Sequence, residues 1–265
     1  MTQKLKLSFA IPVFRNGPSL RKLYDNIRDL FEKDLTEYDF EIVFTDDGSD
    51  DDSLSELLNL RSEDRRVKVI PFTRNFGQMA AILSSLQHCT GDAVVNMSAD
   101  LQEPIETVIK LVAAWRNGSE LVIAYREKRQ DDMRAAITSR IAYKLLRLTY
   151  SQIPKGGFDF YLMDKKVLKE FNSIETRNRY LQGDLLWLGF KMSLVPYTRK
   201  AREFGKSQYN FWKRLKNFVD AFLDSSYLPV RFISVCGMLT SLLGGIYSIT
   251  VVYSYFSDET PFTGW

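Results

Sequence analysis

Side chains that carry oxygen follow a short apolar run in the middle of the chain. The run Ala93–Met97 is followed by Ser98, Asp100 and Gln102, before a proline at Pro104. In an extended segment, residues two apart project to the same side, so these three side chains are expected to point together. Their oxygens suit a hard cation such as Mg²⁺, which often shares its ligands with a substrate phosphate. The alternative interpretation is a strand end with ordinary polar residues.

Three other polar loops are expected to meet at the same edge of a sheet. They follow predicted strands and comprise Pro12–Asn16, Thr45–Ser49 and Thr73–Gly77. Open α/β sheets bind ligands at the carboxyl ends of their strands. The paired acids Asp46 and Asp47 suit hydrogen bonds to a nucleobase imino group and to ribose hydroxyls, and the helix after the third loop is placed to face phosphate. Taken singly, each loop is also consistent with a turn that caps the next helix.

The elements that must position these loops alternate between strand and helix. Short apolar or alternating runs predict strands over residues 5–11, 40–44, 67–72, 93–97 and 120–124. Between them, the apolar spacing predicts helices over residues 16–31, 53–60, 77–87 and 104–115. This order predicts an α/β fold with a mostly parallel sheet and helices on both faces.

The pattern loosens in the second half of the chain. Helices are predicted over residues 132–150 and 179–188, and strands over 158–163 and 191–197. An amphipathic helix is predicted over residues 210–223, either in the lipid headgroup plane or docked on the soluble domain.

A run without charged residues predicts a membrane-spanning helix near the C-terminal end. It extends from Phe232 to Ser257, which is long enough to cross a bilayer with some tilt. Basic residues precede the run and acidic residues follow it, so the N-terminal part is expected in the cytoplasm. A buried helix of a soluble protein is the alternative. No signal peptide is expected, because Leu5–Phe14 predicts a strand.

Composition narrows the class of protein. The chain has 265 residues, enough for a sizeable core, and its net charge of +3 does not indicate a nucleic-acid binder. The cysteines Cys89 and Cys236 lie in different contexts, so no disulfide is expected and a reducing compartment fits. We expect a cytoplasmic domain over residues 1–208, a juxtamembrane amphipathic helix over 209–230 and a transmembrane segment, complete or cropped, over 231–265.

Together, the motifs resemble the family 2 glycosyltransferases, and within them the polyprenyl-phosphate glycosyltransferases such as dolichol-phosphate mannose synthase. The matching residues occur in the family's order, within residues 5 to about 225, and are Ile11–Phe14, Asp46–Ser49, Arg74–Gly77, Ala99–Gln102 and Phe158–Phe160 with Leu162 and Asp164. The resemblance implies a GT-A fold, an inverting transfer, a nucleotide-diphosphate sugar donor, Mg²⁺ or Mn²⁺, and a polyprenyl phosphate acceptor. It also implies the inner membrane, with the catalytic domain cytoplasmic, and a role in cell-envelope glycan synthesis; a homo-oligomer is left open.

The resemblance also implies roles for individual residues. The donor site would comprise Pro12, Phe14, Asp46, Asp47, Asn75, Ser98 and Asp100. Asp100 and Gln102 would be the metal ligands. On the acceptor side, Asp159 would act as a base or an orienting group, Arg126 would belong to a basic loop, and Arg202 would bind phosphate through two parallel hydrogen bonds. A lipid monophosphate does not strictly need a base, because its second ionisation lies near pH 6.

Three positions depart from the family's usual pattern. Ser98 stands where an Asp is usual, Gln208 replaces a Lys, and Gly17 replaces an acidic residue. Metal binding is expected to be weaker for the lack of one carboxylate, unless Glu103 compensates. Ser98 therefore leaves open a membrane-anchored nucleotide-sugar-binding protein with little turnover. A transferase acting on another glycan acceptor is a further alternative.

Overall fold

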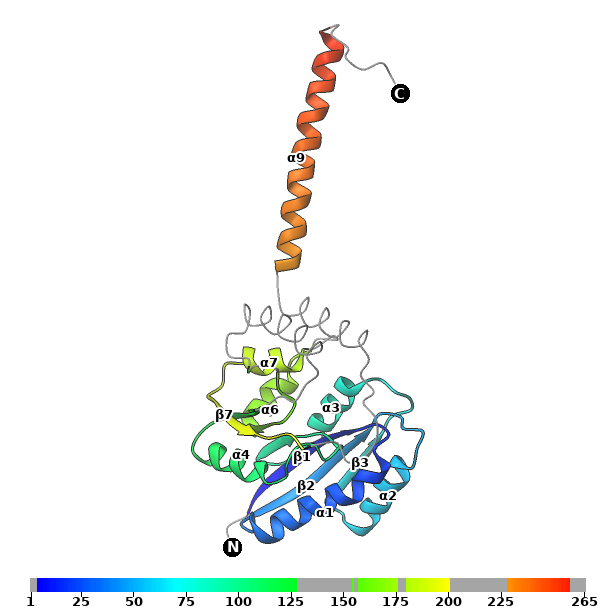
Figure 1. Ribbon diagram of the computed structural model, residues 1–265, viewed down its shortest axis with the longest axis vertical. Coiled ribbons are helices and arrows are strands. Elements are labelled where there is room, and N and C mark those ends of the chain that lie inside the picture. The colour runs from blue at the N-terminus through cyan, green and yellow to red at the C-terminus, as the bar shows by residue number, and fades with distance from the viewer. Residues whose placement is uncertain (1–3, 128–153, 155–156, 176–179, 201–227, 258–265) are drawn as a thin grey trace.

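The computed structural model describes residues 4–127, 154, 157–175, 180–200 and 228–257 (Figure 1). Strands and helices alternate through its first half, as β1 (Leu5–Val13), α1 (Gly17–Lys33), β2 (Tyr38–Asp46), α2 (Ser53–Glu63), β3 (Val67–Pro71), α3 (Gln78–Gln87), β4 (Ala93–Asn96), α4 (Thr107–Arg116) and β5 (Leu121–Arg126). The described part of the second half contains β6 (Tyr161–Asp164), α6 (Lys165–Asn172), α7 (Leu181–Trp187), β7 (Met192–Tyr197) and α9 (Leu228–Phe256).

The strands form one seven-stranded sheet in the order β3-β2-β1-β4-β6-β5-β7. All neighbouring pairs are parallel except those of β6, which runs antiparallel to both β4 and β5. The ends of three parallel strands are in register, because Val13 pairs with Asp46 and Asp46 pairs with Pro71. The predicted α/β fold with a mostly parallel sheet is confirmed.

Helices cover both faces of the sheet, as Figure 1 shows. One apolar cluster includes residues of α1, α2 and α4, and the other includes residues of α3, α6 and α7. Successive strand residues point to opposite faces. Phe9 therefore packs edge-on against Phe31 of α1, with ring centroids 5.9 Å apart, while its neighbour Ala10 belongs to the second cluster.

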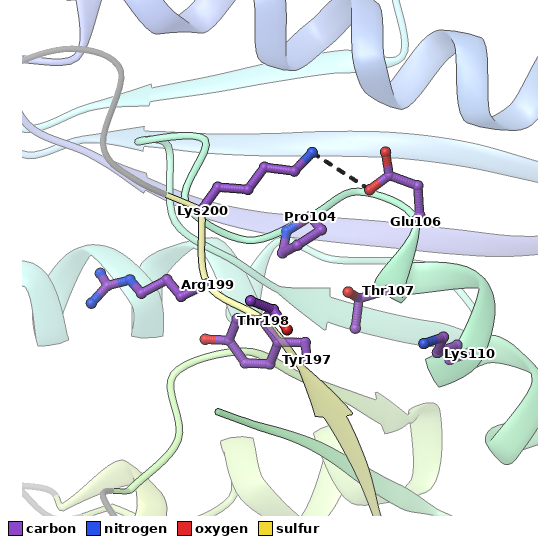
Figure 2. Close-up of a pocket in the computed structure, with 8 residues that line it drawn as sticks. All are labelled: Pro104, Glu106, Thr107, Lys110, Tyr197, Thr198, Arg199 and Lys200. Atoms are coloured by element: carbon purple, nitrogen blue, oxygen red, sulfur yellow. Dashed lines mark ion pairs between the residues drawn. The ribbon is translucent and has the colours of Figure 1, made fainter. Parts of the chain in front are cut away.

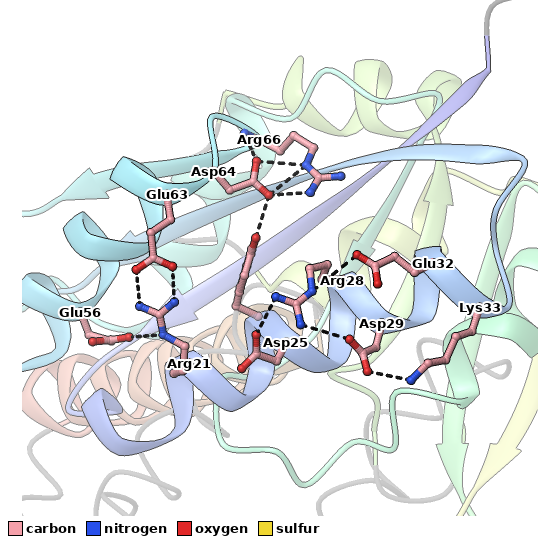
Figure 3. A network of polar contacts seen from close by, with 11 residues as sticks. Arg21, Asp25, Arg28, Asp29, Glu32, Lys33, Glu56, Glu63, Asp64 and Arg66 are labelled. Carbon is pink, nitrogen blue, oxygen red and sulfur yellow. Dashed lines mark hydrogen bonds and ion pairs between the residues drawn. The ribbon is translucent and has the colours of Figure 1, made fainter.

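Ion pairs connect the two helices that lie side by side on one face. Arg21 of α1 contacts both Glu56 and Glu63 of α2 (Figure 3). The Arg21 side chain is 39% exposed, so water screens both contacts and each of them stabilises the fold only weakly. The pairs fix how α1 lies against α2 more than they add to stability.

A buried carboxylate joins three strands far from the polar loops. Glu41 of β2 is 4% exposed and accepts hydrogen bonds from Ser8 Oγ and from the Thr90 backbone N–H, each at 2.6 Å. Lys68 Nζ of β3 lies 2.9 Å from its other oxygen. Burial by itself would raise the pKa of Glu41, but these donors outweigh it and lower the pKa to about 2.

Two of the differences from the predicted elements concern helices. The helix expected from residue 104 begins at Thr107, because a turn precedes it in which the carbonyls of Pro104 and Ile105 accept hydrogen bonds from the N–H groups three residues further on. The predicted elements do not include α6, a helix of eight residues. Its start is fixed by Asp164, whose side chain accepts a hydrogen bond from the Lys166 N–H.

The helix α9 matches the predicted membrane span. Residues Val230–Phe256 are long and apolar enough to cross a bilayer, and none of them is buried against the rest of the protein. Figure 1 shows α9 projecting away from the sheet and its helices. Cys236 within it and Cys89, which is buried, are both free thiols. The helices predicted over 132–150 and 210–223, and the expected boundary at residue 208, lie outside the described residues.

Candidate active site

The reversed strand β6 brings a distant segment to the end of β4. Since the two strands are antiparallel, Asn96 at the end of β4 pairs with Tyr161 at the start of β6. The Asn96 side-chain amide donates to the Asp159 carbonyl at 2.7 Å. The loop after β4 and the segment before β6 therefore meet, although about 60 residues separate them.

The segment after β4 is a turn rather than the extended chain that the sequence predicts. Leu101 has a φ of 60° and is only 7% exposed, so its apolar side chain is turned into the core. Asp100 Oδ1 accepts hydrogen bonds from Ser98 Oγ at 2.7 Å and from the Gln102 backbone N–H at 3.2 Å. Ser98 and Asp100 therefore do lie together, but a turn and not a strand brings them there.

Glu103 is the most deeply buried acid of this loop, at 5% exposed. Its carboxylate accepts hydrogen bonds from the Ser98 N–H at 2.6 Å and from Ser98 Oγ at 2.8 Å. Burial, together with the charges of Asp100 and Asp159, raises the pKa of Glu103 to about 7, even though the Ser98 bonds favour its ionised form. From the sequence, Glu103 appears only as a substitute for the acid that is missing at position 98.

The side chain of Gln102 is engaged with the segment that follows β7. Its amide oxygen accepts a hydrogen bond from Arg199 Nη2, and its backbone carbonyl accepts one from the Lys200 N–H at 2.9 Å. Gln102 can coordinate a cation through that oxygen only if its hydrogen bond from Arg199 is broken. The role of Gln102 as a metal ligand stays a prediction.

Arg126, at the end of β5, completes this side of the site. Its Nη2 lies 3.8 Å from Asp159 Oδ2, and its Nε donates to the Tyr197 hydroxyl at 3.2 Å. Tyr197 is the last residue of β7. Burial, followed by the charge of Glu103, raises the pKa of its hydroxyl. No sequence motif pointed to Tyr197; its place at the end of the strand predicted over residues 191–197 is the only signal that the sequence offered.

The paired acids of the β2 loop point into the protein. Asp46 is 1% exposed and accepts bonds from the N–H and hydroxyl of Ser49. Asp47 is 2% exposed and accepts bonds from the N–H groups of Phe76 and Gly77, at 2.7 and 3.0 Å. Burial raises the pKa of Asp47 despite these donors. In this structure both carboxylates are bound by protein groups.

Asp47 thereby ties the β2 loop to the loop before α3, and we call this contact the clasp. Its second component is Gly48, which has a φ of 66°. A Cβ at Gly48 would lie 2.4 Å from the backbone carbon of Arg74. Asn75 in the clasped loop is exposed, as is Phe76, which lies under the Arg74 guanidinium.

Of the remaining predicted donor residues, Pro12 and Phe14 are partly buried at the end of β1 and just beyond it. The Phe14 N–H donates to the Asn16 side chain at 3.1 Å. One cluster contains Glu103 and Tyr197 together with five of the predicted site residues, namely Ser98, Asp100, Gln102, Arg126 and Asp159. Three other predicted residues lie at the clasp, namely Asp46, Asp47 and Asn75. Arg202 falls outside the described residues.

An open pocket of about 500 Å³ adjoins the cluster (Figure 2). It is lined by residues of α4 and its preceding turn and by residues at and beyond the end of β7, among them Lys110, Tyr197, Arg199 and Lys200. Figure 2 shows Lys200 reaching across to Glu106, at 3.7 Å. The lining is more cationic than anionic, which suits a ligand with negative charge.

The oxygen donors of the loop after β4 fit a hard cation only in part. Asp100 supplies a carboxylate and Ser98 a hydroxyl from one turn. Within the described residues, no group of three or more His, Cys, Asp or Glu side chains is arranged to hold a metal ion. This donor set therefore suits a cation that takes its remaining ligands from a bound diphosphate.

Comparison with known proteins yields a family and close relatives. The sequence profile described as glycosyl transferase family 2 matches residues 8–171. The chain is 33% identical to an uncharacterized glycosyltransferase, YkcC, of Bacillus subtilis, over all of this chain and 82% of that protein. It is 32% identical to the bactoprenol glucosyl transferase of Shigella phage SfX, over 98% of this chain and 86% of that one.

Solved structures share the fold. The mannosyltransferase PcManGT of Pyrobaculum calidifontis, in complex with GDP-Man and Mn²⁺, has a TM-score of 0.57 and is 19% identical, with 84% of this chain and 64% of that chain covered. Glucosyl-3-phosphoglycerate synthase of Mycobacterium tuberculosis, in complex with Mn²⁺, UDP-glucose and phosphoglyceric acid, has a TM-score of 0.56 at 19% identity, over 76% of this chain and 73% of that one.

Proposed function

The chain belongs to glycosyl transferase family 2, and we propose that it transfers a sugar from a nucleotide-diphosphate sugar to a polyprenyl phosphate at a membrane. The observation that carries this proposal is the similarity to bactoprenol glucosyl transferases along nearly the whole chain, α9 included. Their names make glucose the first sugar to test.

The cluster between β4, β5, β6 and β7 supplies groups for such a transfer. The phosphate oxygen of the acceptor would attack the anomeric carbon while the bond to the nucleoside diphosphate breaks, which inverts the configuration. Arg126 is placed to hold negative charge on the incoming phosphate, because a guanidinium binds phosphate oxygens well. Asp159 would orient the acceptor or Arg126, since an ionised lipid phosphate needs no base. Arg202, by resemblance, would add a second phosphate contact.

A divalent cation, Mg²⁺ or Mn²⁺, would be held by Asp100 with help from Ser98 and Gln102. When bound, it supplies positive charge that stabilises the leaving diphosphate. The protein's own contribution there is the turn at Leu101, which sets the Asp100 carboxylate against Ser98.

The helix α9 supports membrane attachment of the enzyme. Charges on either side of it favour a cytoplasmic catalytic domain, so the donor would come from the cytoplasm. The acceptor phosphate lies at the bilayer surface, where a domain tethered by α9 can reach it. The inner membrane is accordingly the proposed location; the assembly state stays a prediction.

The test is transfer of radiolabelled sugar into lipid. Purified protein in detergent would be given undecaprenyl phosphate, Mn²⁺ or Mg²⁺, and a panel of uridine and guanosine diphosphate sugars, with UDP-glucose first. Label is expected in the organic-extractable lipid only when both acceptor and cation are present. Tight donor binding with no label in lipid would instead favour a nucleotide-sugar-binding protein. Label in an added glycan would favour another acceptor.

A further inference from the structure

Gln182 contacts Asp159, although no sequence motif includes it. It is the second residue of α7, and its side-chain nitrogen donates to the Phe158 carbonyl at 2.6 Å and to Asp159 Oδ1 at 3.3 Å. Its side-chain oxygen accepts a hydrogen bond from the Tyr180 hydroxyl at 2.9 Å. The amide is therefore held at both ends, and its nitrogen is directed at the segment before β6.

The Asp159 carboxylate has a different neighbour on each oxygen. Gln182 donates to Oδ1, and the Arg126 guanidinium lies 3.8 Å from Oδ2. The backbone of Asp159 is fixed separately, by the amide of Asn96. Because the side chain is 61% exposed and the last torsion of an aspartate is soft, the backbone contact alone does not orient the carboxylate.

We propose that Gln182 is a positioning residue for Asp159, a proposal that rests on the function given above. Its neutral amide orients Oδ1 without cancelling the charge of the carboxylate. Oδ2 is thereby left facing Arg126 and the acceptor side of the site. An arginine or lysine at position 182 would instead compete with Arg126 for the same carboxylate. Gln182 touches neither the donor nor the acceptor in this arrangement and acts through Asp159.

Two substitutions separate this role from simple packing. Gln182→Met keeps the length of the side chain and removes its three hydrogen bonds, whereas Gln182→Glu keeps the shape and places a second carboxylate beside Asp159. Gln182→Met is expected to lower kcat about tenfold, the effect of losing about one hydrogen bond to a charged group. Gln182→Glu should lower it further, because like charges repel. KM for the nucleotide sugar should stay within about twofold, since none of the residues that Gln182 contacts is a predicted donor residue.

The matched control is Gln87→Met. Gln87 is an exposed glutamine at the end of α3, so the same chemical change there should leave kcat and KM as in the wild type. Thermal unfolding of each variant shows whether any loss of activity comes from loss of fold.

The decisive measurement is a double-mutant cycle with Asp159→Asn. If Gln182 acts through Asp159, then Gln182→Met costs about tenfold in the wild type and little once Asp159 is already replaced. Equal losses in both backgrounds would overturn the proposal. So would a raised KM for the donor with kcat unchanged.

Failure of the proposed function has a separate signature. If the wild type moves no sugar to polyprenyl phosphate, the double-mutant cycle is measured on the slow hydrolysis of the nucleotide sugar. In that reaction the attacking water has to lose a proton, so Asp159 can act as its base. Coupling of the two positions there would uphold the role of Gln182 while refuting the lipid acceptor. Independent effects in that assay would refute the positioning role.

Discussion

At the scale of residues, environment separates acids that look alike in sequence. Asp46 and Asp47 are buried and bound by Ser49, Phe76 and Gly77, so they shape the loops. Asp100 and Glu103 instead share the hydroxyl of Ser98, which has one proton to give and cannot donate to both at once. The acids of the loop after β4 are therefore the ones whose mutual repulsion a cation would relieve.

Asp100→Asn should abolish transfer while the protein stays folded. The amide keeps the shape of the side chain but removes the charge that would hold the cation on the diphosphate. Loss of more than about a hundredfold in kcat is expected from the removal of a main charged ligand. The measurement is transfer of sugar to lipid at limiting and saturating Mn²⁺, with the unfolding midpoint as control. Near-normal activity at limiting Mn²⁺ would contradict the assignment.

Ser98→Asp should make stability depend more strongly on cations. A third carboxylate beside Asp100 and Glu103 repels both when no cation is present, so the unfolding temperature in EDTA should fall by several degrees. Added Mn²⁺ should then raise it more than in the wild type. Ser98→Ala, which adds no charge, is the control. An equal response to Mn²⁺ in wild type and variant would show that position 98 does not face the cation.

At the scale of elements, the clasp holds two loops in a fixed relation at the ends of β2 and β3. Gly48→Ala is expected to destabilise the protein by about 2 kcal/mol or more, because it adds strain at a positive φ and a collision with Arg74. Gly118→Ala separates the two effects: Gly118 also has a positive φ, 89°, but a Cβ there meets only the end of Lys191 at 3.6 Å. Urea unfolding measures both, and equal losses would refute the collision.

The Glu41 network predicts a pH dependence of stability. Its pKa is lowered from 4.5 to about 2 in the folded protein, so its contribution is complete above about pH 4.5 and is lost as the pH falls towards 2. Glu41→Gln should therefore cost about 3 kcal/mol at pH 7 and much less at pH 2.5, by the usual conversion of a pKa shift. Urea titrations at the two pH values measure this. Glu32→Gln, at an exposed glutamate, should show no such difference.

The periodicity of the sequence was sufficient to predict most of the strands and helices of the described fold, but it predicted fewer of the residues that meet at the candidate site. The strands β1 to β5 could be predicted from apolar runs, because a strand that is buried on both faces of a sheet consists mostly of apolar residues. The pairing of β6 between β4 and β5 does not follow, since it depends on contacts between distant segments. For the same reason the motifs pointed to Asp100 and Asp159 but not to Gln182 or Tyr197, which join the cluster only because of where α7 and β7 are placed.

At the scale of the whole molecule, α9 predicts attachment to a bilayer. The double variant Leu242→Arg with Ile246→Arg should weaken insertion by about 5 kcal/mol, if each arginine costs about 2.5–3.5 kcal/mol near the centre of a span. Carbonate extraction of membranes is expected to release more of this variant than of the wild type. Leu58→Arg, on the exposed face of α2, is the control. Equal retention of all three proteins would contradict a membrane span by α9.

The reversed strand has a consequence for how the protein is made. β5 is synthesised well before β6, which lies between β4 and β5 in the finished sheet. The gap between β4 and β5 is therefore filled only when residues 161–164 enter it. During translation, the growing chain therefore carries open strand edges on β4 and β5, which are sites for wrong pairing with other chains. The groups around Asp100, Arg126 and Asp159 assemble only when that gap closes, so a nascent chain halted before residue 161 lacks the site altogether.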